Sequence, residues 1–344
     1  MKISQLFETD KNLKIEREAS LVEVSQICAF DDLKPNGVVF VKNIKFYRKI
    51  IPSFPKIIEL KIGLIFDRVF YESLSPEQHQ DLSQVVWIAT TPSIPESLTL
   101  LSKPFYDRKM SGLNFHVDGR QMGTADISPY AQIAQNVFIG EHVQIENGVV
   151  IMPGSVILPH SKIGEGTVIY PNVTIYPFVE IGKDVRIHSG TTIGSDGFGY
   201  TFMMGIHQKI WHMGGVKISD HVEIGSNVSI DGGTFSPTLI GAGTKIDNFV
   251  QVAHNCKIGK GCVLCGHSGL AGSAVIEDYV VLGGKAGVGP DAYLEKGVQV
   301  AGAGMVNDGA HWPAGSKIGG HPARELKTWM RSVAYLNKVS AKEK

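Results

Sequence analysis

The sequence has no excess of charge of either sign. Its 344 residues include 33 lysines and arginines against 33 aspartates and glutamates, and the isoelectric point is near 7.2. Nothing in this balance suggests the strongly basic character of a nucleic-acid-binding protein. We therefore expect no nucleic-acid partner.

The sequence also lacks long apolar runs. No run approaches the ~18 residues of a transmembrane helix. The first twenty residues mix charges throughout and do not form the apolar core of a secretory signal. We therefore expect a cytoplasmic protein without an integral membrane segment.

Familiar catalytic signatures are missing as well. The sequence contains no Gly-x-Ser-x-Gly, no Walker loop and no His-Glu-x-x-His. Gly197-Phe198-Gly199 is too short to count as a phosphate-binding loop. Any function must therefore be inferred from other features of the chain.

The feature that dominates the sequence is a repeat of six residues. Every sixth residue from Ile127 to Ile193 is isoleucine, and a small residue (Ala, Val, Ser or Thr) follows each of the first eleven by four positions. A period of six fits neither an α-helix nor a simple hairpin. It predicts a solenoid of short strands joined by tight corners, with three hexads in each triangular coil and the large residues stacked inside.

We call these large residues the hexad ladder. It resumes at Ile218, Ile224 and Ile230, and again from Ile240 to Val306, which gives 27 rungs or nine coils before the pattern fails. Corner residues such as Asn136, Asn172 and Gly164 favour tight turns.

The sequence has only four cysteines, and the ladder explains two of them. Cys262-x-x-Cys265-x-His267, with Cys256 nearby, superficially resembles a metal or haem site. However, Cys256 and Cys262 each follow a ladder residue by four positions, which is the small inward slot. We therefore expect buried structural thiols, no disulfide and no metal.

The remaining segments predict further domains. Residues 1–105 lack the ladder and predict an α/β domain with strands near residues 38–41, 60–66 and 85–89. We expect a linker over residues 106–123, the solenoid over 124–320 and a helical segment over 321–344. The apolar side of that helix should pack on the solenoid end or on copies of itself; it carries Leu326, Trp329, Met330 and Val333.

Two interruptions of the ladder predict functional loops. Residues 194–217 leave the pattern altogether, and residues 232–239 hold four extra residues. Long loops on a regular scaffold usually carry function. His254 lies two residues after the ladder residue Val252, where its side chain should point outward. By composition alone, such a histidine is more often simply solvated.

Three separated motifs carry a family resemblance. They are IDN followed by VQVAHN (residues 246–248 and 250–255), SDGFGY (195–200) and FVKNIKF (40–46). In this order they resemble the hexapeptide-repeat acyltransferases of lipid A biosynthesis, and within these the UDP-3-O-(3-hydroxyacyl)glucosamine N-acyltransferases.

The resemblance implies a mainly β fold: a left-handed parallel β-helix with an N-terminal uridine-nucleotide-binding α/β domain and a C-terminal helix. It also implies a homotrimer in the cytoplasm of a Gram-negative bacterium. The implied reaction moves a 3-hydroxyacyl chain from acyl carrier protein to the 2-amino group of a UDP-sugar. No cofactor is implied beyond this acyl donor.

The resemblance also assigns roles to residues. His254 would be the general base and Asp247 its acidic partner. Phe40 and Phe46 would stack on uracil beside Asn43, although Phe40 also fits a strand core. The substrate or acyl loop would hold Asp196, Phe198 and Tyr200, of which the two aromatics could equally be loop anchors. Residues 319–324 resemble the acyl-donor end segment, and the basic face of the last helix suits acyl carrier protein.

Spacing adds one constraint to these roles. Asp247 and His254 lie seven residues apart, about one triangle edge or roughly 20 Å of strand. Any pairing between them should therefore cross a subunit interface.

Two departures from the family pattern leave the function open. Asp291 stands at the second site position, where the family has a histidine of a Gly-His pair, and Gly232 stands where an arginine is usual. Backbone N–H groups, for example at Gly272, could bind the oxyanion instead. Alternatives are another sugar O-acyl- or N-acetyltransferase on the same scaffold, a divergent paralogue, a non-catalytic solenoid such as an ice-binding prism, and a zinc hydratase, for which His212, His254 and His267 lack ligand spacing.

Overall fold

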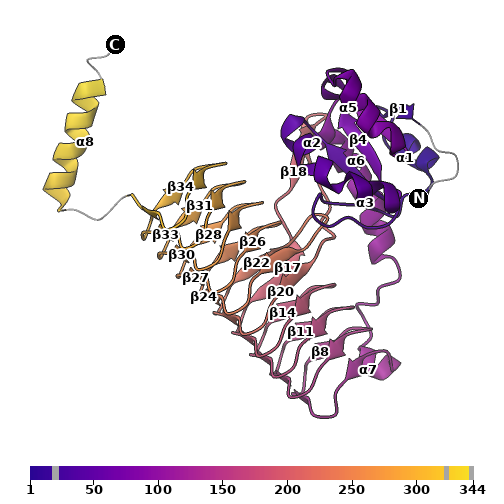
Figure 1. Ribbon diagram of the computed structural model, residues 1–344. Helices are drawn as coiled ribbons and strands as arrows, with labels where there is room; N and C mark the ends of the chain where they lie inside the picture. Colours follow the sequence, from indigo (N-terminus) through magenta and orange to yellow (C-terminus); the bar gives the residue numbers. More distant parts are fainter. Residues whose placement is uncertain (18–22, 321–324, 341–344) are drawn as a thin grey trace.

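The computed structural model describes residues 1–17, 23–320 and 325–340. The chain forms an α/β domain, a long solenoid and a separate C-terminal helix (Figure 1). The α/β domain lies beside the middle of the solenoid, and α8 (Leu326–Ser340) stands beyond its far end (Figure 1). The predicted mainly β architecture is confirmed. None of the described helices is long and apolar enough to cross a membrane.

The α/β domain contains a five-stranded sheet in the order β1-β5-β4-β3-β2. Strands β2 to β5 are parallel and β1 is antiparallel to β5. The strands are β1 (Lys14–Arg17), β2 (Gln26–Ile27), β3 (Gly37–Val41), β4 (Gly63–Asp67) and β5 (Ile88–Thr91). The helices are α1 (Ile3–Thr9), α2 (Ile44–Ile50), α3 (Phe54–Glu59), α4 (Arg68–Glu72), α5 (Pro76–Asp81) and α6 (Ile94–Met110), followed by α7 (Gly119–Met122) before the solenoid.

The solenoid has three parallel sheets of ten, nine and ten strands. Each strand pairs in register with the strand one coil away, as Ile151 does with Ile169. From β6 (Asp126–Ile127) to β16 (Arg186–Ile187) and from β24 (Lys245–Ile246) to β36 (Lys317–Ile318), every strand is two residues long and ends on a ladder position. Between these series lie β17 (Thr192–Asp196), β18 (Tyr200–Met203), β19 (Ile206–Lys209), β20 (Val216–Ile218), β21 (Glu223–Ile224), β22 (Ser229–Gly232) and β23 (Thr238–Ile240).

The two inward slots are filled as the repeat predicts. Ladder residues such as Ile157 and Ile175 are fully buried, and so are small-slot residues such as Val149. Hydroxyls in the small slot are satisfied internally, because Ser155 Oγ donates to the Tyr170 carbonyl at 2.9 Å. Cys256 and Cys262 are also fully buried in this slot, which confirms the structural interpretation of both thiols. All four cysteines are free.

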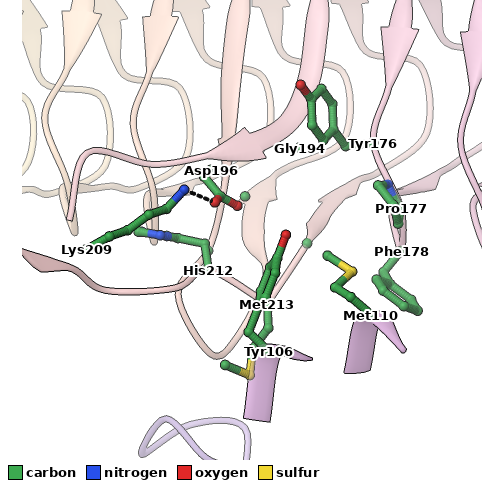
Figure 2. A pocket seen from close by; sticks show the side chains of 13 residues that line it. Tyr106, Met110, Tyr176, Pro177, Phe178, Gly194, Asp196, Lys209, His212 and Met213 are labelled. Carbon is green, nitrogen blue, oxygen red and sulfur yellow. Dashed lines mark ion pairs between the residues drawn. The ribbon is translucent and has the colours of Figure 1, made fainter. Parts of the chain in front are cut away.

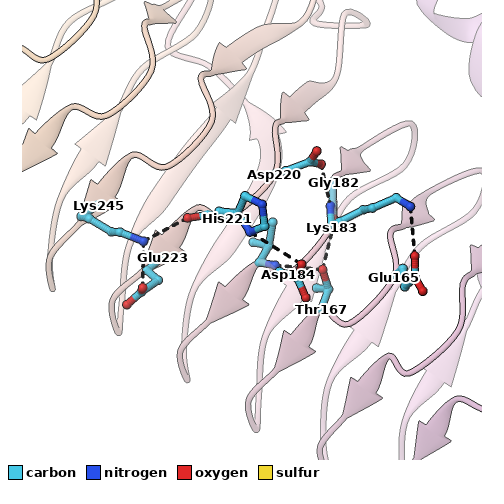
Figure 3. Close-up of polar contacts among 10 residues, drawn as sticks. Glu165, Thr167, Gly182, Lys183, Asp184, Asp220, His221, Glu223 and Lys245 are labelled. Carbon is cyan, nitrogen blue, oxygen red and sulfur yellow. Dashed lines mark hydrogen bonds and ion pairs between the residues drawn. The ribbon is translucent and has the colours of Figure 1, made fainter.

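The corners combine positive φ angles with polar contacts between coils. Asn136 and Asn172 both have φ of 59°. Gly164 serves a different purpose: a Cβ there would lie 2.5 Å from the Gly182 carbonyl oxygen of the next coil. Exposed ion pairs such as Lys183–Glu165 (3.0 Å) run along the corners, as Figure 3 shows. Pairs this exposed add little stability, so the stacked core holds the solenoid together.

Two sequence expectations need correction. The ladder does not fail after Val306, because β35 (His311–Trp312) and β36 extend two of the sheets. Trp312 occupies the rung position six residues after Val306 and pairs in register with Leu294, but it is 38% exposed. Because it is not aliphatic, the repeat pattern did not reveal it. The N-terminal unit also extends past residue 105, because α6 continues through Pro104 to Met110 and takes the first residues of the expected linker.

The long interruption is a folded hairpin, not an open loop. Strands β18 and β19 pair antiparallel, and the segment after them packs on α6. The backbone N–H of Trp211 donates to Ser102 Oγ at 3.1 Å, and the ring centroids of Trp211 and Tyr106 are 4.7 Å apart. The α/β domain thereby holds the inserted hairpin against the solenoid.

Candidate functional site

His254 follows β25 (Gln251–Val252) at a solenoid corner, but its ring is enclosed. The side chain lies outside the solenoid core, but two glycines from other segments pack against it. A Cβ at Gly197, on the inserted segment, would lie 2.5 Å from His254 Cβ, and one at Gly272, a coil away, would lie 2.7 Å from Cε1. Only glycine leaves room for the imidazole at these two points. The ring is half-buried.

Asn255 fixes the tautomer of His254. The Asn255 Oδ1 accepts the Thr234 N–H at 2.7 Å, so its Nδ2 is the atom that faces His254 Nδ1 at 3.0 Å. An amide nitrogen donates, so Nδ1 is the acceptor and the proton of the neutral ring lies on Nε2. Asn255 also joins His254 to the four-residue insertion, because its Nδ2 donates to Thr234 Oγ1.

Electrostatics keep His254 neutral near neutral pH. Burial lowers the pKa of its imidazole, while the Phe198 carbonyl and the charge of Asp291 act in the opposite direction. Asp291 is exposed at the next corner, with φ of 57°, and its N–H donates to the Gly272 carbonyl at 3.2 Å. The structure thus places Asp291 within electrostatic reach of His254.

A cavity of about 270 Å³ opens between α6, the solenoid and the inserted hairpin (Figure 2). Asp196 and Lys209 line it and form an ion pair of 2.5 Å. The rings of Tyr106 and Tyr176 also line it. Of the three residues expected in a substrate loop, Asp196 thus lies in this cavity.

The cavity also contains His212, which the sequence suggests only as a zinc ligand, without the ligand spacing that a zinc site needs. His212 is 4% exposed, and its ring lies edge-on to His254 with centroids 5.0 Å apart. Burial, together with the nearby His254, lowers the pKa of His212 to about 4. A single histidine inside a loop has no periodic signal, so only the fold brings the two imidazoles together.

The two aromatic residues of the expected substrate loop, Phe198 and Tyr200, do not line the cavity. Phe198 is 86% exposed, and its ring contacts that of Tyr200 edge-on at 4.9 Å. Phe202, Met204 and Ile206 continue this apolar surface along the hairpin. An acyl-binding role for Phe198 and Tyr200 stays a prediction.

Asp247 lies at a different corner from His254. Its carboxylate accepts the Asn248 N–H at 2.8 Å and the Gly266 N–H at 2.9 Å. It therefore ties two coils of its own chain together, and within the described residues of this chain it makes no contact with His254. Pairing across a subunit interface stays a prediction.

The three expected uridine contacts lie at the carboxyl end of β3 and in α2. Phe40 is 8% exposed and packs in the domain core, as the alternative interpretation expected. Asn43 caps α2 by accepting the Lys45 and Phe46 N–H groups. Phe46 packs on Phe30 with centroids 5.2 Å apart. Carboxyl ends of parallel strands are where open α/β sheets bind ligands, so the location suits a nucleotide.

Two other expectations can be placed. Residues 321–324 of the expected acyl-donor segment lie outside the described residues, whereas α8 confirms the predicted helix. The described part of the chain contains no cluster of three metal-ligating side chains.

Burial raises the pKa of the Cys256 thiol to about 12, so this cysteine is not a nucleophile.

The six-residue repeat of this chain matches a known protein family model. A family model described as bacterial transferase hexapeptide (six repeats) matches residues 160–195 and 237–272. Both matched stretches lie within the solenoid. This agrees with the strand periodicity and supports the resemblance inferred from the motifs.

Two curated relatives share one name, UDP-3-O-acylglucosamine N-acyltransferase. The chain is 46% identical over 213 residues to a UDP-3-O-acylglucosamine N-acyltransferase of Helicobacter hepaticus, covering 62% of this chain and 65% of the relative. It is 40% identical over 163 residues to the protein of the same name from Methylobacterium nodulans, covering 47% of this chain and 46% of the relative. The chain thus spans about half the length of the first relatives it matches. A solved UDP-N-acetylglucosamine acyltransferase from Campylobacter jejuni is 26% identical, with a TM-score of 0.43 over 52% of this chain and 66% of that one.

Proposed function

We propose that this protein transfers a 3-hydroxyacyl chain from acyl carrier protein to the 2-amino group of UDP-3-O-(3-hydroxyacyl)glucosamine. The observation that carries this proposal is the enclosed, neutral His254 beside a cavity, within a segment that resembles the active-site strand of the N-acyltransferases. The names of the curated relatives support the same reaction. No cofactor enters the proposal other than the acyl donor.

The chemistry requires one base and one site for negative charge. The amine nitrogen attacks the thioester carbonyl carbon, and the amine must lose a proton as the new bond forms. His254 takes that proton and returns it to the thiolate that leaves when the carbon–sulfur bond breaks. A neutral imidazole suits this step, because burial lowers the pKa of His254.

The tautomer sets a condition for this mechanism. With Asn255 donating to Nδ1, the ring proton lies on Nε2, and Nε2 is then no base. Before Nε2 can accept a proton from the amine, the ring proton must shift to Nδ1. This shift requires the Asn255 amide to turn away from Nδ1 and a carboxylate to take its place. We assign that part to Asp247 of a neighbouring subunit in a homotrimer.

A direct assay tests the function. The protein is supplied with 3-hydroxyacyl carrier proteins of several chain lengths and UDP-3-O-acylglucosamine, and the diacylated product is measured. We expect product, and we expect His254→Ala to reduce the rate by roughly 10²–10⁴-fold. His188→Ala is the matched control, because His188 only stacks on Tyr170 at another corner. Unchanged activity of His254→Ala would refute the general-base role.

A divergent paralogue is the second candidate. It is favoured by two departures from the family pattern: Asp291, whose charge acts on His254, and Gly232, which lines the cavity. Absence of product with every chain length would support this candidate and exclude the N-acyltransferase.

A further inference from the structure

Among the described residues, Arg68, Trp87 and Ser268 each have one buried polar atom without a hydrogen-bond partner, and His212 has two. Neither ring nitrogen of His212 has a partner that meets hydrogen-bond geometry, although the side chain is 4% exposed. The Ile210 backbone lies close enough to act on the pKa of the ring, but it does not complete a hydrogen bond. Burying an unpaired polar group destabilises a fold, and native proteins contain few such groups. An apolar side chain of similar size would avoid this cost, so the histidine requires another explanation.

The surroundings of His212 define what could bind to it. In the same cavity, Asp196 and Lys209 neutralise each other at 2.5 Å (Figure 2). Because His212 is itself neutral near neutral pH, the lining offers no net positive charge to hold a phosphate. A neutral imidazole provides one donor and one acceptor, and a hydroxyl group provides the same pair.

The size and walls of the cavity limit the ligand further. A volume of about 270 Å³ lies below the roughly 300–1,000 Å³ of sites that enclose a drug-sized molecule, so the cavity fits a single ring of a larger substrate. Tyr106 and Tyr176 offer aromatic faces to the apolar side of such a ring. His254 lies at the edge of His212, so a group bound here would be next to the candidate base.

We propose that this cavity binds the hydroxyl-bearing sugar ring of the acyl acceptor and that His212 is its hydrogen-bond anchor. One ring nitrogen donates to a sugar hydroxyl and the other accepts from one. That the sugar is an acyl acceptor rests on the function proposed above, whereas the hydroxyl site rests on the cavity alone. The 3-hydroxyl of an acyl chain has the same chemistry, so the test separates these two sources.

Binding and stability are measured on the full chain, without turnover. For His212→Leu we expect an unchanged or higher melting temperature, because an unpaired polar group is removed. We expect its dissociation constant for UDP-3-O-(3-hydroxyacyl)glucosamine to rise about tenfold or more. His212→Gln should largely restore binding, because an amide also donates and accepts. His221→Leu is the control, since His221 pairs with Asp184 at an exposed corner.

Each outcome decides the proposal. A lower melting temperature for His212→Leu, with no recovery of binding in His212→Gln, would make His212 a structural residue. A second ligand carries an acyl chain without the 3-hydroxyl. An equal loss of affinity for both ligands supports a sugar site, and a loss seen only with the hydroxylated ligand overturns it.

The assay also separates this inference from the proposed function. If the wild-type protein binds the UDP-sugar through His212 but forms no product, the sugar site stands and the acyl transfer fails. If it binds no UDP-glucosamine derivative, the sugar site is refuted whatever the activity.

Discussion

Gly272 controls the space that the ring of His254 occupies. A methyl group at this position would lie 2.7 Å from His254 Cε1 and 2.8 Å from Nε2. We expect Gly272→Ala to displace the imidazole and lower kcat about 100-fold, because small misplacements of a catalytic group are costly. Gly269→Ala is the matched control: there the nearest atom to the new methyl is a carbonyl oxygen 4.0 Å away. Equal rates for both variants would mean that the ring position is unimportant.

Asn255 offers a way to change the tautomer and the pH dependence together. In the wild-type protein, burial lowers the pKa of His254 below its ordinary value of 6.5. The imidazole is therefore neutral, and able to act as a base, at any pH above this lowered pKa. In Asn255→Asp, the new carboxylate would accept a hydrogen bond from the Nδ1–H group of His254 and add a negative charge beside it. Both effects favour the protonated ring and raise its pKa. We expect the acid limb of kcat/KM to move to higher pH by about one unit.

The control for this change is Asn172→Asp, a corner residue with a similar φ of 59°. It should leave the pH profile unchanged. A profile of Asn255→Asp that matches the wild type would show that Asn255 does not set the protonation of His254.

At single positions, the sequence predicted which residues occupy the inward slots of the solenoid, because their distance from a ladder residue is fixed. It predicted little else at this scale. The slots of Cys256 and Cys262 followed from their distance to a rung. The enclosure of His254 did not, because Gly197 reaches it from an inserted segment with no fixed period. The contact of His212 with His254 was missed for the same reason.

Trp211, directly after the inserted hairpin, helps to attach it to α6, together with Thr201, whose Oγ1 donates to the Pro95 carbonyl at 3.4 Å. The ring of Trp211 lies 4.7 Å from Tyr106, and the ammonium groups of Lys103 and Lys209 lie 5.2 and 4.7 Å from it. We expect Trp211→Ala to release β18 and β19 and to speed their amide hydrogen exchange at least about tenfold, while the ladder strands stay protected.

Trp312→Ala, at the last coils, is the control and should leave the hairpin unaffected. Unchanged exchange in β18 and β19 of Trp211→Ala would show that other contacts hold the hairpin.

Elements were predictable where one physical rule repeats. Period six gave the solenoid strands, and apolar runs located β3, β4 and β5 within a few residues. The hairpin was expected only as an interruption, because its pairing depends on contacts with α6 that are distant in sequence. The last two strands were missed, because Trp312 satisfies the geometry of a rung without being aliphatic.

At the scale of the whole molecule, one chain holds only part of the proposed site. His254, His212 and the cavity come together within the chain, whereas Asp247 lies at another corner and binds its own backbone. The helix α8 also leaves Leu326, Trp329 and Met330 exposed at 71%, 48% and 55%. Both features suit an assembly of several copies, in which neighbours supply what one chain lacks.

Mixing two inactive variants tests whether Asp247 and His254 pair between subunits. We expect Asp247→Asn and His254→Ala each to be nearly inactive alone. After joint unfolding and reassembly at equal amounts, about one quarter of the interfaces in a cyclic trimer combine an intact Asp247 from one subunit with an intact His254 from the next. Activity should therefore recover to roughly a quarter of the wild-type level, measured against reassembled wild-type protein. Pairing within one chain predicts no recovery, because each chain then carries one defect at its own site.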